Sequence, residues 1–234
     1  MSLILCIDTA QPDAGIYLAE EGKLIDFSLN GNQQDHAAWI HSAIDELLKR
    51  QNRTVTELSA IAVIEGPGSY TGLRVGMATA KGLCYALQVP LITESSLKAM
   101  AASLLVDKEF ISATISANYT ANDFLLAPMI DARRMEVFTA VYDTSLNVDL
   151  IPQSLILDSD SFSQLLNKSK IFFFGSGSFK WKNICNHSSA NFVTTTMNGM
   201  AVVSLCYDKF LNKEFTILTY SEPVYLKEFY IHHK

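Results

Sequence analysis

The pattern of hydrophobic and polar residues along the chain changes between a strand-like and a helix-like period. Short apolar runs bounded by turn residues predict strands near the amino terminus and mid-chain, at 3–7, 15–19, 24–29 and 60–64. Glu21-Gly22 has the composition of a hairpin turn between the second and third of these strands. Strands that precede and alternate with helical segments indicate mixed α/β structure.

The segment from His36 to Arg50 has a helical period. Its apolar positions lie on one stripe and charged residues lie opposite, which predicts an amphipathic helix. Trp39 and Ala43 widen the apolar stripe around Ile40 beyond what contact with one sheet requires. We therefore expect part of this helix to face a partner.

The remaining segments predict a first lobe over 1–106, a connecting segment over 107–123 and a smaller second lobe over 124–234. A strand over 90–93 and a helix ending at Leu105 complete the first lobe. The connecting segment is rich in Ser, Asn and Thr, which favours a loop. The second lobe has predicted strands at 124–130, 137–142 and 170–174 and predicted helices at 162–166 and 200–211.

Composition narrows the classes of function. The chain has 234 residues, 49% of them hydrophobic, and a net charge of −6, which argues against unaided binding to a nucleic-acid backbone. The four cysteines show neither C-x-x-C nor metal-ligand spacing, which favours reduced thiols and a cytoplasmic location. No apolar run reaches the roughly 18 residues that predict a membrane span, so we expect no membrane association.

A glycine-rich turn joins the strand at 60–64 to the next helix. Its sequence, Glu65-Gly66-Pro67-Gly68-Ser69-Tyr70-Thr71-Gly72, lacks the lysine of a P-loop and the third glycine of a dinucleotide fingerprint. Ser69 or Thr71 is a candidate helix N-cap, and an anion is favoured at such a helix start. The candidate anion-binding residues are Gly66, Gly68, Ser69, Thr71 and Gly72; the alternative is a purely structural turn.

The helix after this turn, expected from Gly72 to Leu87, carries two stripes of small residues. One stripe is Gly72, Gly76, Ala80 and Cys84, and the other is Ala78, Gly82 and Ala86. Glycine inside a helix costs about 1 kcal/mol relative to alanine, so close packing has to offset it. We predict that one stripe rests on the sheet and that the other meets a partner helix. The predicted interface residues are Trp39, Ile40, Ala43, Gly72, Gly76, Ala80 and Cys84.

The histidines show no metal-ligand spacing. His36 and His41 are five residues apart and so do not share a helix face. We interpret His36 as a hydrogen-bonding residue at the helix start, and the pair His232-His233 as tail. The sequence predicts no metal site and no catalytic residues.

Five segments together resemble the bacterial TsaB (YeaZ) family. The most specific is Glu65 to Gly76, which follows the family pattern Gly-Pro-Gly-Ser-Phe/Tyr-Thr-Gly-Leu-Arg-Ile/Val-Gly. The others fall in the family order across almost the whole chain, at 5–10, His36, 131–137 and 223–227. Met135 departs from the pattern, since it stands where the family usually has glycine.

The resemblance implies two RNase-H-like α/β lobes of the actin-like ATPase kind, the second of them reduced. It implies a non-catalytic subunit of the complex that transfers a threonylcarbamoyl group to adenosine 37 of ANN-decoding tRNAs. The expected partners are the TsaD paralogue and the TsaE ATPase, with a homodimer when the chain is alone and tRNA contacted only through the complex. We expect no firmly bound cofactor, although ATP or ADP is a candidate ligand at the complex interface.

In related ATPases an Asp-Thr pair after the first strand lies near the nucleotide phosphates. Asp8 and Thr9 are therefore further candidates for nucleotide binding, although an aspartate at a strand end more often accepts hydrogen bonds from turn amides. Two other functions are open alternatives. One is a glycoprotease-like hydrolase; the other is a nucleotide-binding enzyme that uses the Gly66–Gly72 loop, with Glu94 as a ribose partner.

Overall fold

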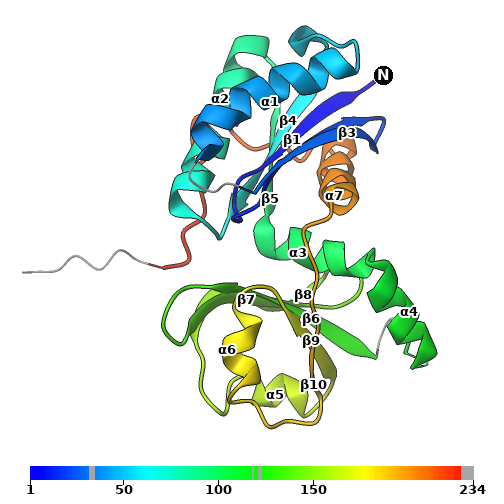
Figure 1. Ribbon diagram of the computed structural model, residues 1–234, viewed down its shortest axis with the longest axis vertical. Helices are drawn as coiled ribbons and strands as arrows, with labels where there is room; N and C mark the ends of the chain where they lie inside the picture. The colour runs from blue at the N-terminus through cyan, green and yellow to red at the C-terminus, as the bar shows by residue number, and fades with distance from the viewer. Residues whose placement is uncertain (32–34, 118, 121–122, 228–234) are drawn as a thin grey trace, which may run out of the picture. The chain divides into compact units, whose positions relative to one another are not determined.

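The computed structural model describes residues 1–31, 35–117, 119–120 and 123–227 (Figure 1). The chain forms two compact units. The first comprises Met1–Ala99 and Met197–Val224, and the second comprises Met100–Thr196 and Tyr225–Lys234. His232 and His233 lie outside the described residues.

The first unit is built on a five-stranded sheet. Its strands are β1 (Leu3–Asp8), β2 (Ala14–Glu20), β3 (Lys23–Asn30), β4 (Ala60–Gly66) and β5 (Leu91–Ser95), in the order β3-β2-β1-β4-β5. The first three strands form an antiparallel meander, and β4 and β5 add parallel to β1. The predicted hairpin turn at Glu21-Gly22 connects β2 and β3, and both residues have left-handed φ angles, of 50° and 74°.

Helices cover both faces of the first sheet. On one face, α1 (His36–Arg50) and α2 (Tyr70–Leu87) pack over Leu5 and Ile7 of β1, with the 3-10 turn Val55–Glu57 at the edge. On the other face, α7 (Gly199–Leu211) packs over Ile4 and Cys6. Successive residues of a strand point to opposite faces, so a strand buried on both sides is apolar throughout. The run Leu-Ile-Leu-Cys-Ile in β1 meets that requirement.

The second unit repeats this strand order. Its strands are β6 (Phe124–Asp131), β7 (Glu136–Tyr142), β8 (Val148–Ile156), β9 (Lys170–Phe174) and β10 (Ala190–Phe192). Read from β8, the order is β8-β7-β6-β9-β10, with an antiparallel meander followed by two parallel additions. The prediction of two α/β lobes is confirmed by this repetition.

The helices of the second unit are shorter than those of the first. The short helices α5 (Ser163–Leu166) and α6 (Ser178–Lys182) pack on one face of its sheet. The core on that face is aromatic, since Trp181 is fully buried and contacts Phe162, Phe173 and Phe192. The helix α3 (Ser96–Leu105) contains the point at which the chain passes from the first unit to the second.

The segment 107–123, which we expected to be a loop, contains a helix, α4 (Lys108–Ser116). Asp107 accepts hydrogen bonds from the amides of Glu109 and Phe110, at 3.0 and 2.9 Å, and so caps the helix. The Phe110 ring packs edge-on against Phe124 and Phe172. The sequence contained the capping aspartate. The rings that contact Phe110, however, belong to strands farther along the chain.

The bounds predicted for the last helix agree with α7 within one residue, but the helix belongs to the first unit and not to the second. We placed 200–211 in the second lobe, whereas α7 packs on the first sheet through Val202, Val203 and Cys206. The strands β8 and β10 and the helix α6 were not predicted. Among the described residues, no helix combines the length and the apolar character needed to cross a membrane.

Candidate functional site

The end of β1 brings Asp8 into the interior of the first unit. The carboxylate of Asp8 is fully buried, and its Oδ1 accepts a 2.9 Å hydrogen bond from the amide of Ala10. Its Oδ2 is buried and has no hydrogen-bond partner among the described residues. Burial raises the pKa of Asp8 to about 6. The hydrogen bond to a turn amide agrees with the structural interpretation of this aspartate.

The glycine turn between β4 and α2 lies directly against the end of β1. The Thr9 hydroxyl donates a 2.7 Å hydrogen bond to the carbonyl of Gly72, and the amide of Ser69 donates a 2.8 Å bond to the carbonyl of Ala10. Ser69 is the N-cap of α2 and accepts from the amide of Gly72. Two amides that we considered for anion binding, those of Ser69 and Gly72, are therefore used within the protein.

Close approach of two backbones explains the glycines of this turn. A Cβ at Gly68 would overlap the carbonyl oxygen of Ala10, and one at Gly72 would overlap that of Thr9. Gly66 has a φ of 121°, which side-chain-bearing residues rarely adopt, and the carbonyl of Val224 approaches it. The amide of Val224 donates a 2.8 Å hydrogen bond to the carbonyl of Glu65. These contacts show a structural role for the turn; an anion bound by Gly66, Gly68, Ser69, Thr71 or Gly72 stays a prediction.

An ion pair lies at the ends of β4 and β5. Lys209 of α7 places its Nζ 3.1 Å from Oε2 of Glu94 and donates a 2.7 Å hydrogen bond to the carbonyl of Thr93. Glu94 is only 3% exposed. Burial raises the pKa of the neighbouring Glu65. Glu94, which we considered as a ribose partner, is instead buried against Lys209, and no local sequence signal could have paired residues so far apart in the chain.

The histidines do not form a metal centre in the described part of the chain. His36 begins α1 and is buried, with its Nε2 3.2 Å from the carbonyl of Pro12, which agrees with a hydrogen-bonding role at the helix start. His187 contacts the amide oxygen of Asn167. Among the described residues, no group of three or more His, Cys, Asp or Glu side chains is arranged to hold a metal ion.

The two small-residue stripes of α2 face different surroundings. A Cβ at Gly76 would overlap the Thr9 hydroxyl, and Ala80 and Cys84 are buried in the core beneath α2. By contrast Ala78, Gly82 and Ala86 are exposed, and the space around Gly82 is open. The stripe that we assigned to a partner is therefore the one that packs on the sheet.

The same correction applies to α1. Ile40 and Ala43 are buried in the core of the first unit, and Trp39 is the one member of the predicted α1 interface that is partly exposed. The helices α1 and α2 lie side by side on one face of the sheet (Figure 1). The broad apolar stripe of α1 is explained by contact with both the sheet and α2.

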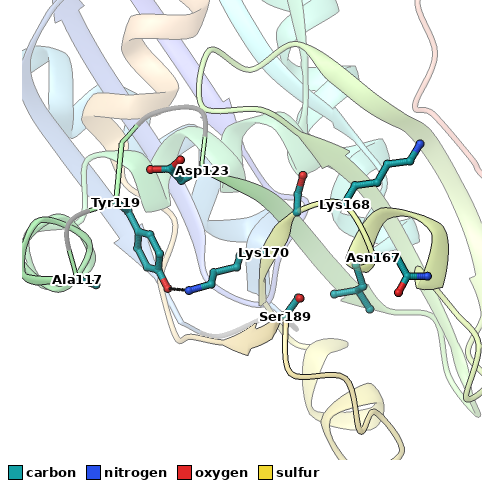
Figure 2. A pocket seen from close by; sticks show the side chains of 9 residues that line it. Ala117, Tyr119, Asp123, Asn167, Lys168, Lys170 and Ser189 are labelled. Atoms are coloured by element: carbon teal, nitrogen blue, oxygen red, sulfur yellow. Dashed lines mark hydrogen bonds between the residues drawn. The ribbon is translucent and has the colours of Figure 1, made fainter.

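A separate cavity of about 550 Å³ lies in the second unit, and none of its lining residues is a site candidate of the sequence analysis (Figure 2). Lys170 and Tyr119 point toward each other there: Lys170 Nζ donates a 2.5 Å hydrogen bond to the Tyr119 hydroxyl and lies 4.5 Å from the ring centroid. Lys168 extends away from this pair (Figure 2). The Lys170 ammonium therefore already has an aromatic partner.

Comparison with known proteins decides the family. The chain is 31% identical to TsaB of Bacillus subtilis, a tRNA threonylcarbamoyladenosine biosynthesis protein, over 74% of this chain and 70% of that one. It is 24% identical to TsaB of Haemophilus influenzae over 96% of this chain and 93% of the relative. A family model described as TsaD, tRNA N6-adenosine threonylcarbamoyltransferase, matches residues 31–167. This chain belongs to the TsaB (YeaZ) family.

Two solved structures from Pseudomonas aeruginosa share the fold of this chain. YeaZ from Pseudomonas aeruginosa superposes with a TM-score of 0.75 at 23% identity, covering 97% of this chain and 100% of that chain. A second structure, of an uncharacterized Pseudomonas aeruginosa protein with similarity to peptidase YeaZ, gives a TM-score of 0.76 at 22% identity with the same coverage. The predicted family and the two-lobed α/β fold are thus confirmed.

Proposed function

We propose that this TsaB-family chain is a non-catalytic subunit of the complex that transfers a threonylcarbamoyl group to adenosine 37 of ANN-decoding tRNAs. Membership of the family places the chain in tRNA threonylcarbamoyladenosine biosynthesis. In the proposal it pairs with the TsaD paralogue, allows the TsaE ATPase to join, and forms a homodimer when it is alone.

The observation that carries the pairing proposal is the exposed side of α2. Ala78, Gly82 and Ala86 form a stripe without bulky side chains, and Tyr85 beside them is 74% exposed. A helix with a smooth face lets a second helix approach closely, and an exposed aromatic residue next to it supplies apolar area for an interface. The opposite side of α2 is already used by the sheet, so this is the side that a partner can reach.

The non-catalytic part of the proposal is supported by how the polar side chains of the first unit are engaged. Asp8 accepts from Ala10, Thr9 donates to Gly72, and Glu94 pairs with Lys209. A catalytic nucleophile needs a base within hydrogen-bond reach and a group that orients the base. Thr9, Glu94 and Oδ1 of Asp8 are instead used to hold the turn, α7 and the end of β1 in place, while Oδ2 of Asp8 has no hydrogen-bond partner among the described residues. In this proposal any ATP or ADP is bound at the interface with TsaD.

Reconstitution tests the function directly. Purified TsaC, TsaD and TsaE are supplied with tRNA, ATP, threonine and bicarbonate, and threonylcarbamoyladenosine is measured with and without this chain. We expect omission of the chain to abolish product and Asp8→Ala to leave substantial activity. Product formed at the full rate without the chain would contradict the proposal, and so would a folded Asp8→Ala protein with no activity, since that result points to direct nucleotide chemistry.

The pairing surface has its own test. Gly82→Leu adds a bulky side chain where, apart from its chain neighbours and the backbone of its own helix, no atom lies within 4 Å of the added Cβ, so the unit should fold normally. We expect the variant to fail to associate with TsaD in size-exclusion chromatography and sedimentation at several concentrations. Normal association of Gly82→Leu with TsaD would place the interface elsewhere.

A further inference from the structure

The hairpin tip between β6 and β7 carries two adjacent arginines in an unfavourable backbone conformation. Arg133 and Arg134 have φ angles of 70° and 49°. The left-handed region is unfavourable for a residue with a Cβ, and in turns it is occupied mainly by Gly, Asn and Asp. Neither arginine has the short polar side chain that eases this conformation. The residues are therefore poor choices for the turn itself, which indicates that their side chains serve another purpose.

Hydrogen bonds hold the tip in this conformation. The amide of Arg133 donates to Oδ1 of Asp131 at 2.6 Å, and the amide of Glu136 donates to the carbonyl of Arg133 at 3.1 Å. The amide of Ala132 donates to the carbonyl of Glu136, and that of Leu157 to the carbonyl of Met135. The turn is thus bonded both across the hairpin and to the segment after β8.

Both carboxylates beside the tip already have lysine partners. Lys180 of α6 places Nζ 2.8 Å from Oδ1 of Asp131 and also donates to the carbonyl of Glu136. Lys227 pairs with the Glu136 carboxylate, which also accepts from the Ser154 hydroxyl. The ion pairs of both carboxylates are therefore made by lysines, and the nearby charge of Arg133 also helps to lower the pKa of Asp131.

The guanidinium groups themselves are exposed. Neither Arg133 nor Arg134 has a side-chain hydrogen bond or ion pair with another described residue. Four cationic side chains surround two carboxylates here, so the tip has excess positive charge in a chain whose net charge is −6. A guanidinium is planar and always charged, and its fork of donors matches the oxygens of a phosphate.

We propose that the β6–β7 hairpin tip binds the sugar-phosphate backbone of tRNA through the guanidinium groups of Arg133 and Arg134. The inference rests on the proposed function, because it takes the complex to be the place where this chain meets tRNA. It goes beyond the expectation that tRNA is contacted only through the other subunits. The contact is independent of base sequence, since phosphate contacts position a nucleic acid without reading it.

An acidic protein partner fits the tip less well than a phosphate backbone. A stable protein interface buries about 800 Å² on each side and is anchored by apolar residues at its centre. Within the turn, the large apolar side chain is that of Met135, which is 38% exposed. A nucleic-acid backbone needs only separate cationic contacts, which a narrow tip can supply.

The test uses a variant that improves the turn while it removes the charges. Arg133→Asn/Arg134→Gly places residues that tolerate a positive φ at both positions, so the second unit should fold at least as well as in the original chain. The control Lys108→Ser/Lys168→Ser removes two exposed lysines of the same unit that lie outside the hairpin. Each protein is assembled with TsaD and TsaE, and the affinity for an unmodified ANN-decoding tRNA transcript is measured at several salt concentrations.

We expect the hairpin variant to bind tRNA severalfold more weakly than the original assembly. The slope of log affinity against log salt should fall by about 1–2, while assembly with TsaD is unchanged. The lysine control should keep the original slope. Arg133→Lys/Arg134→Lys should recover most of the slope, because it keeps both charges.

Three outcomes would overturn the inference. An unchanged affinity and slope for the hairpin variant would show that the tip does not touch tRNA. Loss of assembly with TsaD or TsaE, with tRNA binding by the remaining subunits unaltered, would assign the arginines to a protein carboxylate. If the original chain itself neither joins TsaD nor supports modification, the proposed function fails and the inference fails with it, which is distinct from a defect limited to the variant.

Discussion

In the first unit the turn after β4 leads into a helix of 18 residues, whereas in the second unit the equivalent turn after β9 leads into one of 5 residues. The turns themselves are alike. The amide of Ser69 donates to the carbonyl of Ala10 in the first unit, and the amide of Gly177 donates to the carbonyl of Met129 in the second, at 2.8 and 3.0 Å. The glycine turn thus packs against the segment just after β1 in the first unit and against β6 in the second.

This comparison shows that both units share the glycine turn as a structural feature. They differ in the helix that follows the turn. A Cβ at Gly175 would lie 2.5 Å from the carbonyl oxygen of Met129, as one at Gly68 would overlap that of Ala10. Each of these helices has a buried and an exposed side: in the short helix α6, Trp181 is fully buried and Phe179 is 62% exposed. The exposed side of the 18-residue α2 is longer than that of the 5-residue α6 and offers a partner more surface.

The first strands of the two sheets both end in an aspartate, and the two carboxylates differ in environment. Asp8 is fully buried and lacks a cationic partner among the described residues, while the Asp131 side chain is 42% exposed and pairs with Lys180. Burial raises the pKa of Asp8 to about 6. Burial also acts to raise the pKa of Asp131, but the hydrogen bonds from Lys180 and the Arg133 amide lower it overall.

The unfolding of each unit can be followed separately by fluorescence, because the chain has two tryptophans, Trp39 in the first unit and Trp181 in the second. Trp181→Phe leaves fluorescence from the first unit, and Trp39→Phe leaves fluorescence from the second. Each stability prediction below is measured by urea unfolding. The variant is made in the single-tryptophan protein whose fluorescence reports the unit that carries the substitution.

The largest expected effect separates the two sides of α2. Gly76→Leu places a side chain where even a Cβ overlaps the Thr9 hydroxyl, so we expect a loss of about 3 kcal/mol or more in the free energy of unfolding of the first unit. Gly82→Leu is the matched control in the same helix. Because its site is open and leucine favours a helix, the control should be as stable as the original chain or more so. Equal destabilisation by both changes would contradict the assignment of the two sides.

The second prediction concerns Asp8 and pH. The folded-state pKa of about 6 lies above the usual aspartate value of 3.8, so the folded protein binds the proton more tightly and stability falls as pH rises between these values. Asp8→Asn removes the charged form, and it should raise the free energy of unfolding by up to about 3 kcal/mol at pH 7.5. At pH 3.5 the variant and the original should have similar stability. A gain of the same size at both pH values would show that burial of charge is not the cause.

The third prediction compares the glycine turns. Gly68→Ala introduces a Cβ against the carbonyl of Ala10, just after β1, and Gly175→Ala introduces one against the carbonyl of Met129 in β6; Gly175 also has a φ of 90°. We expect each to destabilise its own unit by about 1–3 kcal/mol. Fluorescence of Trp39 should report the first change and that of Trp181 the second. A stable Gly68→Ala protein that lost a phosphate ligand would instead support the anion-binding prediction.

The smallest effect is expected at Asp131. Its pKa is lowered in the folded state, so its contribution is present above the unfolded-state pKa and is lost as pH falls through the folded-state value. Asp131→Asn should lower the stability of the second unit at pH 7 by a few tenths of a kcal/mol, since the pair is partly exposed and screened. The sign is opposite to that for Asp8→Asn. A stabilising effect of Asp131→Asn at pH 7 would remove the contrast between the two aspartates.

Much of the first unit could be predicted from the sequence. The bounds of α1 agree with the prediction, and every end of the three meander strands agrees within one residue. In the second unit, β8 and β10 were missed. Strand β8 contains Pro152 and is partly exposed along its length, so its pattern lacks the clear alternation of a half-buried strand.

The candidate site was predicted only in part. Asp8, Thr9 and the glycine turn were selected together, and the structure does bring them into contact through the Thr9–Gly72 hydrogen bond. We assigned the wrong stripe of α2 to a partner, because the stripe with Gly76 and Ala80 packs on the sheet. Both stripes consist of small residues with the same spacing, so periodicity alone contains no information that distinguishes them.

The sequence by itself determined the family, through a long contiguous motif, and the local elements, through hydrophobic periodicity and capping residues. Only the tertiary structure decided that the strand order is repeated, that α7 returns to the first sheet, and that Lys209 compensates Glu94. The reason is physical: a helix or strand follows from interactions within a few residues. The pairing of distant segments depends on shape and charge complementarity among side chains that have no fixed separation along the chain.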